Sequence, residues 1–300
     1  MNFEKIKITF PEIRENEGLK SHSTFRVGGV ADLFFEARTK ESLIGIIAFA
    51  YNEKIPYILI GRGTNCLFTD KGVRGLVIKN LTSAITIDGN FIHADSGALW
   101  AQIVNEAVKH NLSGAEPLYG LPGTIGAAVW GNSGVPAVET GSLVRSVDVF
   151  NPINGIRTID IRKNPQAIKF SYRHTSLQNS SDIVVAVTLE LKHGNAEESK
   201  KLMKEINEAR LAKQPIGFSA GSFFKNPSKE KPAGMLIDQV GLKGFSIGDA
   251  EISTKHGNFF INKSNATFAD IIALRDTAIK AVKEKFGITL QMEARVIGEV

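Results

Sequence analysis

The glycine-rich segment Gly61–Asn65 constrains the fold of this chain more than any other, because it directly follows the apolar run Tyr57–Ile60. A strand that ends in glycines lets backbone amides approach a phosphate, as in dinucleotide-binding folds. A Rossmann fingerprint needs a third glycine where Cys66 stands, and a helix after it. Residues 67–77 have the pattern of a turn and a strand instead. The sequence therefore excludes a Rossmann fold and leaves two interpretations, a phosphate-binding loop of another kind and a tight turn between strands.

Runs typical of strands alternate with runs typical of helices along the whole chain. The pattern predicts strands at Asp32–Ala37, Tyr57–Ile60, Leu76–Lys79, Ile85–Ile87, Phe91–His93, Arg145–Phe150, Ile156–Ile161, Ile183–Leu191 and Ile288–Ile297. It predicts helices at Glu41–Lys54, Leu99–Asn111, Ala196–Lys213 and Thr267–Phe286. A βαβ opening is followed by a hairpin signal at Asp88–Asn90, so we predict an α+β architecture. Changes of pattern divide the chain into residues 1–80, 81–195 and 196–300.

The bulk composition is that of a folded soluble protein. The chain has 300 residues, 43% hydrophobic and 22% charged, enough for a large core or for two to three domains. It lacks an apolar run of the roughly 18 to 20 residues that a membrane helix needs, and it opens without a signal pattern. The single cysteine, Cys66, excludes an internal disulfide framework and a cysteine-based zinc cluster. These features predict a cytoplasmic protein in which Cys66 is a small buried residue.

The charge balance points to anionic small molecules rather than to nucleic acid. The formal net charge is +5 and the pI near 9.1, but Lys and Arg are scattered among acids and form no stripe with interleaved aromatics. The alternative outside enzymes is a basic carbohydrate- or nucleic-acid-binding module. No zincin, EF-hand or Walker A pattern occurs, so we predict no metal, and no obligate protein partner is indicated.

A second glycine-rich segment, Gly120–Gly134, contains more small residues than a plain loop requires. Small side chains expose the backbone, and Thr124, Asn132 and Ser133 add local donors. Such a segment suits a pyrophosphate and a flat ring system. The alternative is a compact loop that covers a core, although the length of the segment makes this less typical.

The segment Gly221–Pro227 places Ser222, Lys225 and Asn226 around two phenylalanines, between two residues that break regular structure. This arrangement suits a site, and the alternative is a surface turn anchored by its aromatics. The overlapping segment Gly217–Gly221 matches the nucleophile elbow of α/β-hydrolases. An elbow needs a strand before it and a helix after it, and the prolines on both sides oppose them, so we do not predict a serine hydrolase.

Two charged residues complete the set of candidates. Arg173 follows Tyr172, and Glu293 lies in the predicted last strand on the face opposite to its apolar residues. Taken alone, both positions are typical of solvent-exposed residues.

Together these segments resemble the UDP-N-acetylenolpyruvoylglucosamine reductases, flavoenzymes of bacterial peptidoglycan synthesis. The resemblance covers most of the chain, because the family motifs recur in order. They are Ser23–Gly29, the Gly61 loop, Leu121–Thr124, Tyr172–Arg173, the Gly221 loop, Ala233–Asp238, Gly241–Gly244 and Glu293–Gly298.

The resemblance implies an FAD-binding fold of the vanillyl-alcohol-oxidase type (PCMH-type), with two α+β subdomains followed by a C-terminal α+β substrate-binding domain. Its final strand would return toward the flavin. FAD is implied as a non-covalent cofactor and NADPH as the hydride-donating cosubstrate. The implied cofactor-binding residues are Gly61, Arg62, Gly63, Thr64, Asn65, Leu121, Pro122, Gly123, Thr124, Gly126, Ala127, Asn132, Ser133 and Gly134. The alternative on the same fold is another flavin-dependent sugar or alcohol oxidoreductase.

The resemblance also implies roles for individual residues. Ser222 is implied as the general acid that protonates C2 of the enolpyruvyl group, while Arg173 and Glu293 stabilise the enol. The implied substrate-binding residues are Lys213, Asn226 and His256.

The chain departs from the family pattern in three places, one of which is Trp130–Gly134, where the family often has Met-Asn-Ala-Gly. Ala127 and Ala128 stand where the family often has two glycines, so we expect a tighter flavin pocket. The stretch between Tyr172 and Leu191 lacks the tyrosine-bearing loop that covers the substrate in one subgroup. The chain therefore resembles the subgroup without that lid.

Overall fold

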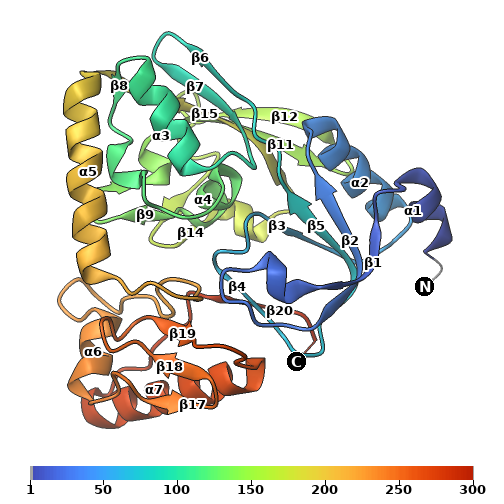
Figure 1. Cartoon of the computed structure of the whole chain (residues 1–300). Coiled ribbons are helices and arrows are strands. Elements are labelled where there is room, and N and C mark those ends of the chain that lie inside the picture. Colours follow the sequence, from blue (N-terminus) through green and yellow to red (C-terminus); the bar gives the residue numbers. More distant parts are fainter. Residues whose placement is uncertain (1–2, 300) are drawn as a thin grey trace. The chain divides into compact units, whose positions relative to one another are not determined.

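The computed structural model describes residues 3–299 and shows two compact units (Figure 1). The first unit contains the residues up to Ile13, Phe35–Arg62 and Ile78–Arg210. The second contains Arg14–Phe34, Gly63–Val77 and the residues from Leu211 onward. Each unit is thus assembled from separate stretches of the chain. The division into residues 1–80, 81–195 and 196–300 stays a prediction.

The first unit is a mixed α/β body. Its helices are α1 (Glu4–Thr9), α2 (Lys40–Asn52), α3 (Trp100–Lys109) and α4 (Ile125–Gly131). Its longer strands are β3 (Tyr57–Ile60), β6 (Ile85–Asp88), β7 (Phe91–Asp95), β11 (Val144–Asn151), β12 (Gly155–Asp160) and β15 (Ile183–Glu190). Two-residue strands are β8 (Leu112–Ser113), β9 (Gly134–Val135), β10 (Val138–Glu139), β13 (Phe170–Ser171), β14 (His174–Thr175) and β16 (Lys192–His193). Strands β2 (Val30–Ala37) and β5 (Val73–Asn80) and helix α5 (Ala196–Lys213) contain residues of both units.

An antiparallel sheet in the order β12-β11-β15-β7-β6 forms the centre of the first unit. Buried and less buried residues alternate along β7 and most of β15, and α3 packs on the β6–β7 end of the sheet. The core between them includes Trp100 and Ile103 from α3 with Val147 and Val187 from the sheet, all at most 1% exposed. This core supports α4, which packs on β15 and carries part of the second glycine-rich segment.

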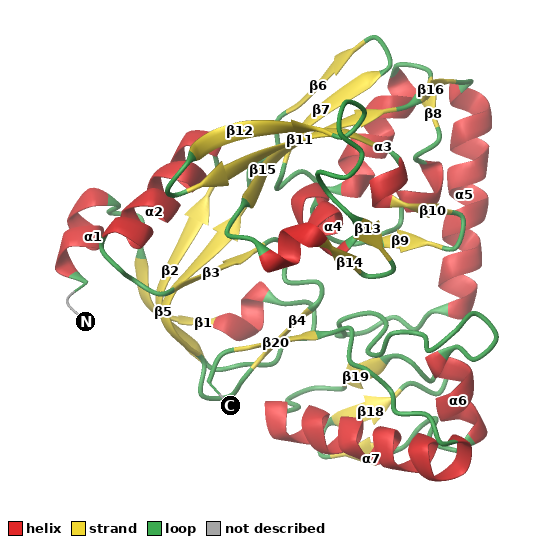
Figure 2. Ribbon diagram, turned by 180° about the vertical axis from the view of Figure 1, so that it is seen from behind, coloured by secondary structure: helices red, strands yellow, loops and turns green. Residues whose placement is uncertain are grey.

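The second unit has a separate core rich in phenylalanine. Its elements are β1 (Arg14–Gly18), β4 (Cys66–Phe68), β17 (Ser246–Ile247), β18 (Ala250–Ile252), β19 (Phe260–Asn262), β20 (Arg295–Ile297), α6 (Ala233–Gln239) and α7 (Phe268–Phe286). Figure 2 shows α7 running along the small sheet of β17, β18 and β19. Phe223 stacks on Phe260 with ring centroids 4.2 Å apart, and Phe224 packs edge-on against both. These aromatics anchor the Gly221–Pro227 loop, as one sequence interpretation proposed.

The sequence patterns located most of the regular elements. The predicted helix Ala196–Lys213 and strand Tyr57–Ile60 have the same bounds in the structure. The predicted hairpin is confirmed, because Asp88 pairs with Phe91 around a turn in which Gly89 has a φ of 56°. The turn and strand predicted for residues 67–77 are confirmed as the turn at residues 70–71 and β5, although the short strand β4 before the turn was not predicted. No helix follows the loop within residues 66–80, in agreement with the exclusion of a Rossmann fold.

The predicted last strand, Ile288–Ile297, is wrong in length. Regular strand structure is confined to β20, because its partner β4 has only three residues and pairs in parallel from Arg295 with Cys66. The apolar alternation is only partly a burial pattern. Leu290 and Ala294 are buried, but Val296 is 37% exposed.

Helix α4 was not predicted, because its sequence is dominated by glycine, alanine and short side chains that read as loop. Ile125 and Val129 are fully buried and provide the packing that holds the helix. It ends at Asn132, whose left-handed φ of 45° is the conformation in which many helices stop. Conversely, no helix lies between α5 and α6, so the elbow-like segment Gly217–Gly221 lacks the helix that a nucleophile elbow requires.

None of the helices within residues 3–299 combines the length and the apolar composition of a membrane-spanning segment.

Candidate active site

The two predicted cofactor loops meet in the first unit. A Cβ atom added at Gly61 would lie 2.6 Å from Thr124 Oγ1, so only a glycine lets the end of β3 approach the second glycine-rich segment this closely. Gly126 has a similar role, because a Cβ there would lie 2.6 Å from Cβ of Ser96. The fold thus brings together two segments that are about 60 residues apart in the sequence.

The backbone amides at the start of α4 are already engaged within the protein. The amide of Ile125 donates to the carbonyl of Ala98, and that of Gly126 donates to the carbonyl of Ser96, both at 2.8 Å. These bonds fix the helix start rather than point its amides at a ligand. The side of α4 at Ala127 is exposed and carries only a methyl group. A contact between Gly126 or Ala127 and the cofactor stays a prediction.

Asn132 is fully buried and holds the segment that carries Arg173. Its Nδ2 donates to Ser171 O and to Glu139 Oε2, both at 2.9 Å, and its Oδ1 accepts from the amide of Gly141 at 3.0 Å. The three hydrogen bonds use the side chain inside the protein. The structure therefore supports a scaffold role for Asn132, while its predicted contact with the cofactor stays untested.

The neighbouring residues of the same segment are also part of this scaffold. Ser133 O accepts hydrogen bonds from the amide of Thr140 at 2.9 Å and from its hydroxyl at 2.7 Å. A Cβ at Gly134 would lie 2.6 Å from Val138 O, so this position requires glycine.

Arg173 lies at the turn between β13 and β14. Its φ is 56°, a left-handed conformation that is uncommon for a residue with a side chain and often marks a functional position. The guanidinium group is half-buried, lies 5.1 Å from the ring of Tyr172 and reaches Gly134 O at 3.5 Å. Thr175 Oγ1 donates to Trp130 O at 2.7 Å, which ties the hairpin to α4. These contacts therefore fix the position of Arg173, which is not a freely mobile surface cation.

Ser222 and Glu293 lie on neighbouring backbone segments of the second unit. The amide of Glu293 donates to Phe223 O at 2.8 Å, which pairs the residue after Ser222 with Glu293 itself. Both side chains are half-buried, which is the exposure expected of groups that meet a ligand. Two candidates 71 positions apart thus lie on segments joined by backbone hydrogen bonds, which include a further bond from the amide of Lys225 to Gln291 O at 2.8 Å.

A buried asparagine clamps the other side of the Ser222 loop. Asn258 Oδ1 accepts from the amide of Phe224 at 2.9 Å, its Nδ2 donates to Phe224 O at 2.8 Å, and its own carbonyl accepts from the amide of Phe223 at 2.8 Å. Because Asn258 is only 2% exposed, these bonds are shielded from water. The loop is therefore rigid at the residue that follows Ser222.

Residues of the first glycine loop lie beside this pair in the second unit. Asn65 Nδ2 donates to Glu293 O at 3.0 Å, and Asn65 O accepts from the amide of Arg295 at 2.9 Å. Gly63 has a φ of 68°, and a Cβ there would lie 2.0 Å from His22 O, so no other residue fits. The loop predicted to hold a cofactor is thus bound directly to a predicted catalytic residue.

His256 is half-buried and its hydrogen bonds define its tautomer. Its Nδ1 accepts a hydrogen bond from the amide of Asn258 at 3.1 Å, so the ring proton is on Nε2. Burial, together with the charge of Lys243, lowers the pKa of His256 below its ordinary value. The imidazole is therefore neutral at pH 7 and presents a single N–H donor.

The other two predicted substrate residues occupy different environments. Lys213 is the exposed last residue of α5. Asn226 Oδ1 accepts from the amide of Ala233 at 3.0 Å and so satisfies one of the unpaired amides at the start of α6. Part of the Asn226 side chain therefore has a structural function.

The residues of the glycine loops fit an FAD molecule. Neither Gly61–Asn65 nor Leu121–Ala127 contains a carboxylate, and Arg62 adds an exposed positive charge, as a pyrophosphate requires. Ser23 lies against Gly63, and its Oγ is buried with no hydrogen-bond partner among the described residues. A buried hydroxyl in this state is typical of a site that a ligand completes.

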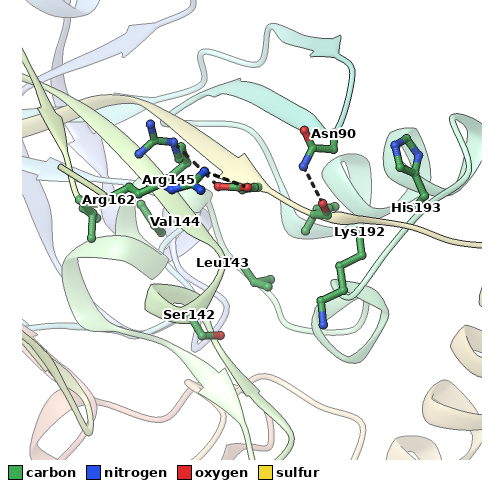
Figure 3. Close-up of a pocket in the computed structure, with 11 residues that line it drawn as sticks. Asn90, Ser142, Leu143, Val144, Arg145, Arg162, Lys192 and His193 are labelled. Carbon is green, nitrogen blue, oxygen red and sulfur yellow. Dashed lines mark hydrogen bonds and ion pairs between the residues drawn. The ribbon is translucent and has the colours of Figure 1, made fainter. Parts of the chain in front are cut away.

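Figure 3 shows a cleft of about 580 Å³ elsewhere in the first unit, at the start of β11 and the end of β15. Glu190 in this cleft lies 3.8 Å from Arg145 and 3.7 Å from Arg162. None of the predicted site residues lines it. Within residues 3–299 no group of acidic, histidine or cysteine side chains has the arrangement of a metal site. Cys66 is half-buried rather than fully buried as the sequence predicted, and burial raises the pKa of its thiol to about 12.

Two family models match successive parts of the chain. Residues 31–159 match the model described as FAD binding domain, and residues 212–297 match that of the C-terminal domain of UDP-N-acetylenolpyruvoylglucosamine reductase. The fold and the site therefore define an FAD-dependent oxidoreductase with an α+β flavin-binding fold of the vanillyl-alcohol-oxidase type.

Relatives named UDP-N-acetylenolpyruvoylglucosamine reductase match nearly the whole chain. The protein from Caldanaerobacter subterraneus subsp. tengcongensis is 42% identical and that from Clostridium novyi 37% identical; the matches cover 95% and 96% of this chain and 93% of each relative. The crystal structure of the Thermus caldophilus enzyme is 35% identical, with a TM-score of 0.79 over 95% of this chain and 98% of that one. This chain belongs to the UDP-N-acetylenolpyruvoylglucosamine reductase family.

Sequence reasoning missed the residues that hold the candidates in place. The sequence patterns assign no role to Asn258, and Thr24 enters only within the motif Ser23–Gly29. A buried asparagine has no periodic signature, so its role emerges only when its backbone partners are known.

Proposed function

We propose that this protein reduces the enolpyruvyl ether of UDP-N-acetylglucosamine to UDP-N-acetylmuramate, with NADPH as the electron donor. The observation that carries the proposal is the backbone pairing of Phe223 with Glu293 beside Asn65. This pairing assembles the proposed proton donor, a second catalytic residue and part of the proposed cofactor loop within one unit. The reaction consumes one hydride and one proton for each double bond reduced.

Bound FAD supplies a two-electron carrier that accepts hydride from NADPH and delivers it to C3 of the enolpyruvyl group. The residues of the chain handle the charge and the proton that this transfer requires. As hydride reaches C3, negative charge develops at C2 and on the substrate carboxylate. Arg173 and Glu293 stabilise this enol, Arg173 because its guanidinium offers a planar fork of donors to a carboxylate.

Ser222 then donates its hydroxyl proton to C2. A serine hydroxyl is a weak acid, so it protonates only a strongly basic centre such as this enolate, and solvent restores the proton after turnover. The rigid backbone after Ser222 is consistent with this role, because proton transfer requires a donor held within hydrogen-bonding distance.

The remaining candidates would bind the nucleotide sugar. Lys213 brings an exposed positive charge to a phosphate, and His256 donates from Nε2 as a neutral group. The side-chain NH2 group of Asn226 would donate to the substrate while its Oδ1 stays on α6. Since the substrates are NADPH and a nucleotide sugar, we place the reaction in the cytoplasm and expect these two small molecules to suffice for turnover.

The test is a spectrum followed by an assay. We expect the purified protein to be yellow, or to become so with added FAD, and to oxidise NADPH only when the enolpyruvyl sugar nucleotide is present. A colourless protein that takes up no FAD would contradict the cofactor. Rapid NADPH oxidation that consumes oxygen without the sugar nucleotide would indicate a different flavin oxidoreductase.

A further inference from the structure

Thr24 connects two segments of the second unit that carry different parts of the proposed site. Its backbone amide donates to Gly63 O in the first glycine loop at 3.2 Å. Its hydroxyl donates to Ser219 O at 2.7 Å, three residues before Ser222 and 195 positions away in the sequence. One residue therefore holds the glycine loop with its backbone and the Ser222 loop with its side chain.

Asn65 makes the corresponding connection on the other side. Its side-chain amide donates to Glu293 O at 3.0 Å, across 228 positions of sequence. The amide of Glu293 in turn donates to Phe223 O at 2.8 Å. These two bonds link the glycine loop to Glu293, and Glu293 to the residue after Ser222.

Together the four hydrogen bonds close a ring. It runs from Gly63 through Thr24 to Ser219, along the chain to Phe223, across to Glu293, and back through Asn65 to Gly63. Ser222 and Glu293 both lie on this ring. Two of the four bonds are between backbone groups, so the Thr24 hydroxyl and the Asn65 amide are its only side-chain links.

We propose that Thr24 and Asn65 are positioning residues, which fix Ser222 and Glu293 relative to the glycine loop Gly63–Asn65. This inference rests on the proposed function and adds to it. Neither side chain needs to touch the substrate for this role. Each acts by setting where a catalytic neighbour lies.

Loss of the Thr24 hydroxyl leaves the surrounding turn in place. The ring of Phe25 packs edge-on against Phe223 at 6.4 Å, and the buried Asn262 donates to Phe25 O at 3.1 Å. The backbone bond from Thr24 to Gly63 also survives any change of side chain. We therefore expect Thr24→Val, which keeps the shape and removes the donor, to fold and to bind FAD.

Thr24→Val should slow only one of the two half-reactions, the reduction of the enolpyruvyl group. Electron transfer from NADPH does not use Ser222, whereas reduction of the enolpyruvyl group does. Small displacements of catalytic groups cost about 10- to 100-fold in rate. We expect reoxidation of the protein-bound flavin by the sugar nucleotide to slow by about this factor, while reduction by NADPH stays within about twofold of wild type.

The experiment compares wild type, Thr24→Val and Thr24→Ser holoenzymes by stopped-flow, with rates expressed per bound flavin. Thr24→Ser restores the hydroxyl and should recover most of the reoxidation rate. Ser222→Ala is combined with Thr24→Val, because a residue that acts through Ser222 has little further effect once Ser222 is gone. Full additivity of the two changes, or equal slowing of both half-reactions, would overturn the proposal.

Asn65→Asp tests the second link with a readout that does not depend on turnover. The substitution keeps the size of the side chain but replaces its donor with an oxygen that faces Glu293 O. Hydrogen exchange followed by mass spectrometry should show faster exchange at residues 292–295 in Asn65→Asp and at 219–224 in Thr24→Val. Exchange that stays at the wild-type rate in both segments would show that the ring does not hold them.

The proposed function and the positioning role of Thr24 can be tested separately. Wild-type protein that does not oxidise NADPH with the sugar nucleotide contradicts the proposed function, whatever the variants do. Active wild-type protein whose Thr24→Val variant matches it per bound flavin contradicts only the positioning role.

Discussion

The two regions that carry the proposed catalytic residues are held in place in different ways. Arg173 in the first unit sits on a two-stranded hairpin, and Asn132, which fixes that hairpin, is 39 positions from its partner Ser171. Ser222 and Glu293 in the second unit depend on Thr24 and Asn65, which are 195 and 228 positions from their partners. The first region is thus built locally. The second is assembled from three remote segments, so its geometry depends on the whole unit being folded.

This difference predicts how each region responds to mutation. A local hairpin can be disturbed without affecting the rest of its unit, whereas the ring in the second unit transmits a change at any of its links. The predictions below test that contrast, and they begin with the catalytic residues themselves.

The largest expected effect is that of Ser222→Ala in the second unit. Removing the proton donor should slow reoxidation of the flavin by the sugar nucleotide roughly 10²- to 10⁴-fold, the usual range for a general acid. Reduction by NADPH should stay nearly intact. Stopped-flow measurement of the two half-reactions checks this.

The matched control for Ser222→Ala is Ser219→Ala. Alanine keeps the Ser219 carbonyl that accepts from the Thr24 hydroxyl and removes only a long hydrogen bond, 3.4 Å, from the amide of Gly221 to Ser219 Oγ, so we expect a loss of at most about threefold. Equal slowing of both half-reactions in Ser222→Ala would contradict the proton-donor role. A large loss of activity in Ser219→Ala would indicate that Ser219, the serine of the elbow-like segment, takes part in catalysis.

The next effect is that of Arg173→Lys in the first unit. Lysine keeps the charge but lacks the planar fork, and hydrogen bonds to charged groups contribute about 1.5–3 kcal/mol each. We therefore expect kcat/KM for the sugar nucleotide to fall about 10- to 100-fold. Steady-state kinetics with the sugar nucleotide as the varied substrate measure it.

Arg162→Lys provides a control in the same unit, because Arg162 lies at the cleft of Figure 3 and is 70% exposed. It should behave like wild type. If Arg173→Lys also behaves like wild type, Arg173 is only a surface residue, as its sequence position alone had suggested.

Two buried asparagines allow the local and the remote region to be compared directly. Asn132→Gly keeps the left-handed conformation but removes three hydrogen bonds around the Arg173 hairpin, and Asn258→Ala removes two around the Ser222 loop. Each should cost about 1–3 kcal/mol of stability, because buried partners are left unsatisfied. Urea denaturation measures this cost.

The kinetic consequences of the two asparagine variants should differ in kind. Asn132→Gly should mainly raise KM for the sugar nucleotide, because it loosens the hairpin of Arg173, the residue proposed to bind the substrate carboxylate. Asn258→Ala should mainly lower the reoxidation rate, because it loosens the proton donor. The same kinetic change in both variants would show that the contrast between local and remote construction does not extend to function.

The amino-acid sequence predicted the elements better than it predicted the contacts between them. The helix at residues 196–213 was predicted with its true bounds, because this stretch consists largely of strong helix formers and contains no Gly or Pro. Prediction failed at residues 288–297, where strand length depends on a partner of three residues that local pattern does not reveal. It also failed at α4, where only the structure shows that Gly126 is required by its close packing against Ser96.

The candidate site shows the same limit. Motifs singled out Ser222, Arg173 and Glu293, but no motif states that Glu293 pairs with Phe223 or that Asn132 is used within the protein. Those facts depend on contacts across tens to hundreds of positions, and a single sequence records no such pairs. The motifs therefore proposed residues for the chemistry, and their roles stay predictions, whereas no motif pointed to the positioning role of the residues that hold them in place.

The smallest expected effect concerns His256 and the pH dependence of stability. Its pKa is lowered in the folded protein, chiefly by burial, while the unfolded chain has the ordinary value of about 6.5. The unfolded state therefore binds more protons in acid, so the contribution of His256 is fully present above pH 6.5 and is lost as the pH falls through the folded pKa. Protonation would also place a proton on Nδ1, where the amide of Asn258 now donates.

We expect the urea midpoint of wild type to fall between about pH 7.5 and pH 5.5 by more than that of His256→Gln, which does not titrate. His193→Gln serves as the control, because His193 is exposed and should leave the wild-type pH dependence intact. His256 accepts a hydrogen bond from the amide of Asn258, and the Asn258 side chain binds the backbone of Phe224. The loss of stability in acid should therefore be accompanied by slower flavin reoxidation in wild type. A His256→Gln variant with the same pH dependence as wild type would show that His256 does not make the Ser222 loop sensitive to pH. The response of the second region to mutation would then depend on its hydrogen-bonded ring alone.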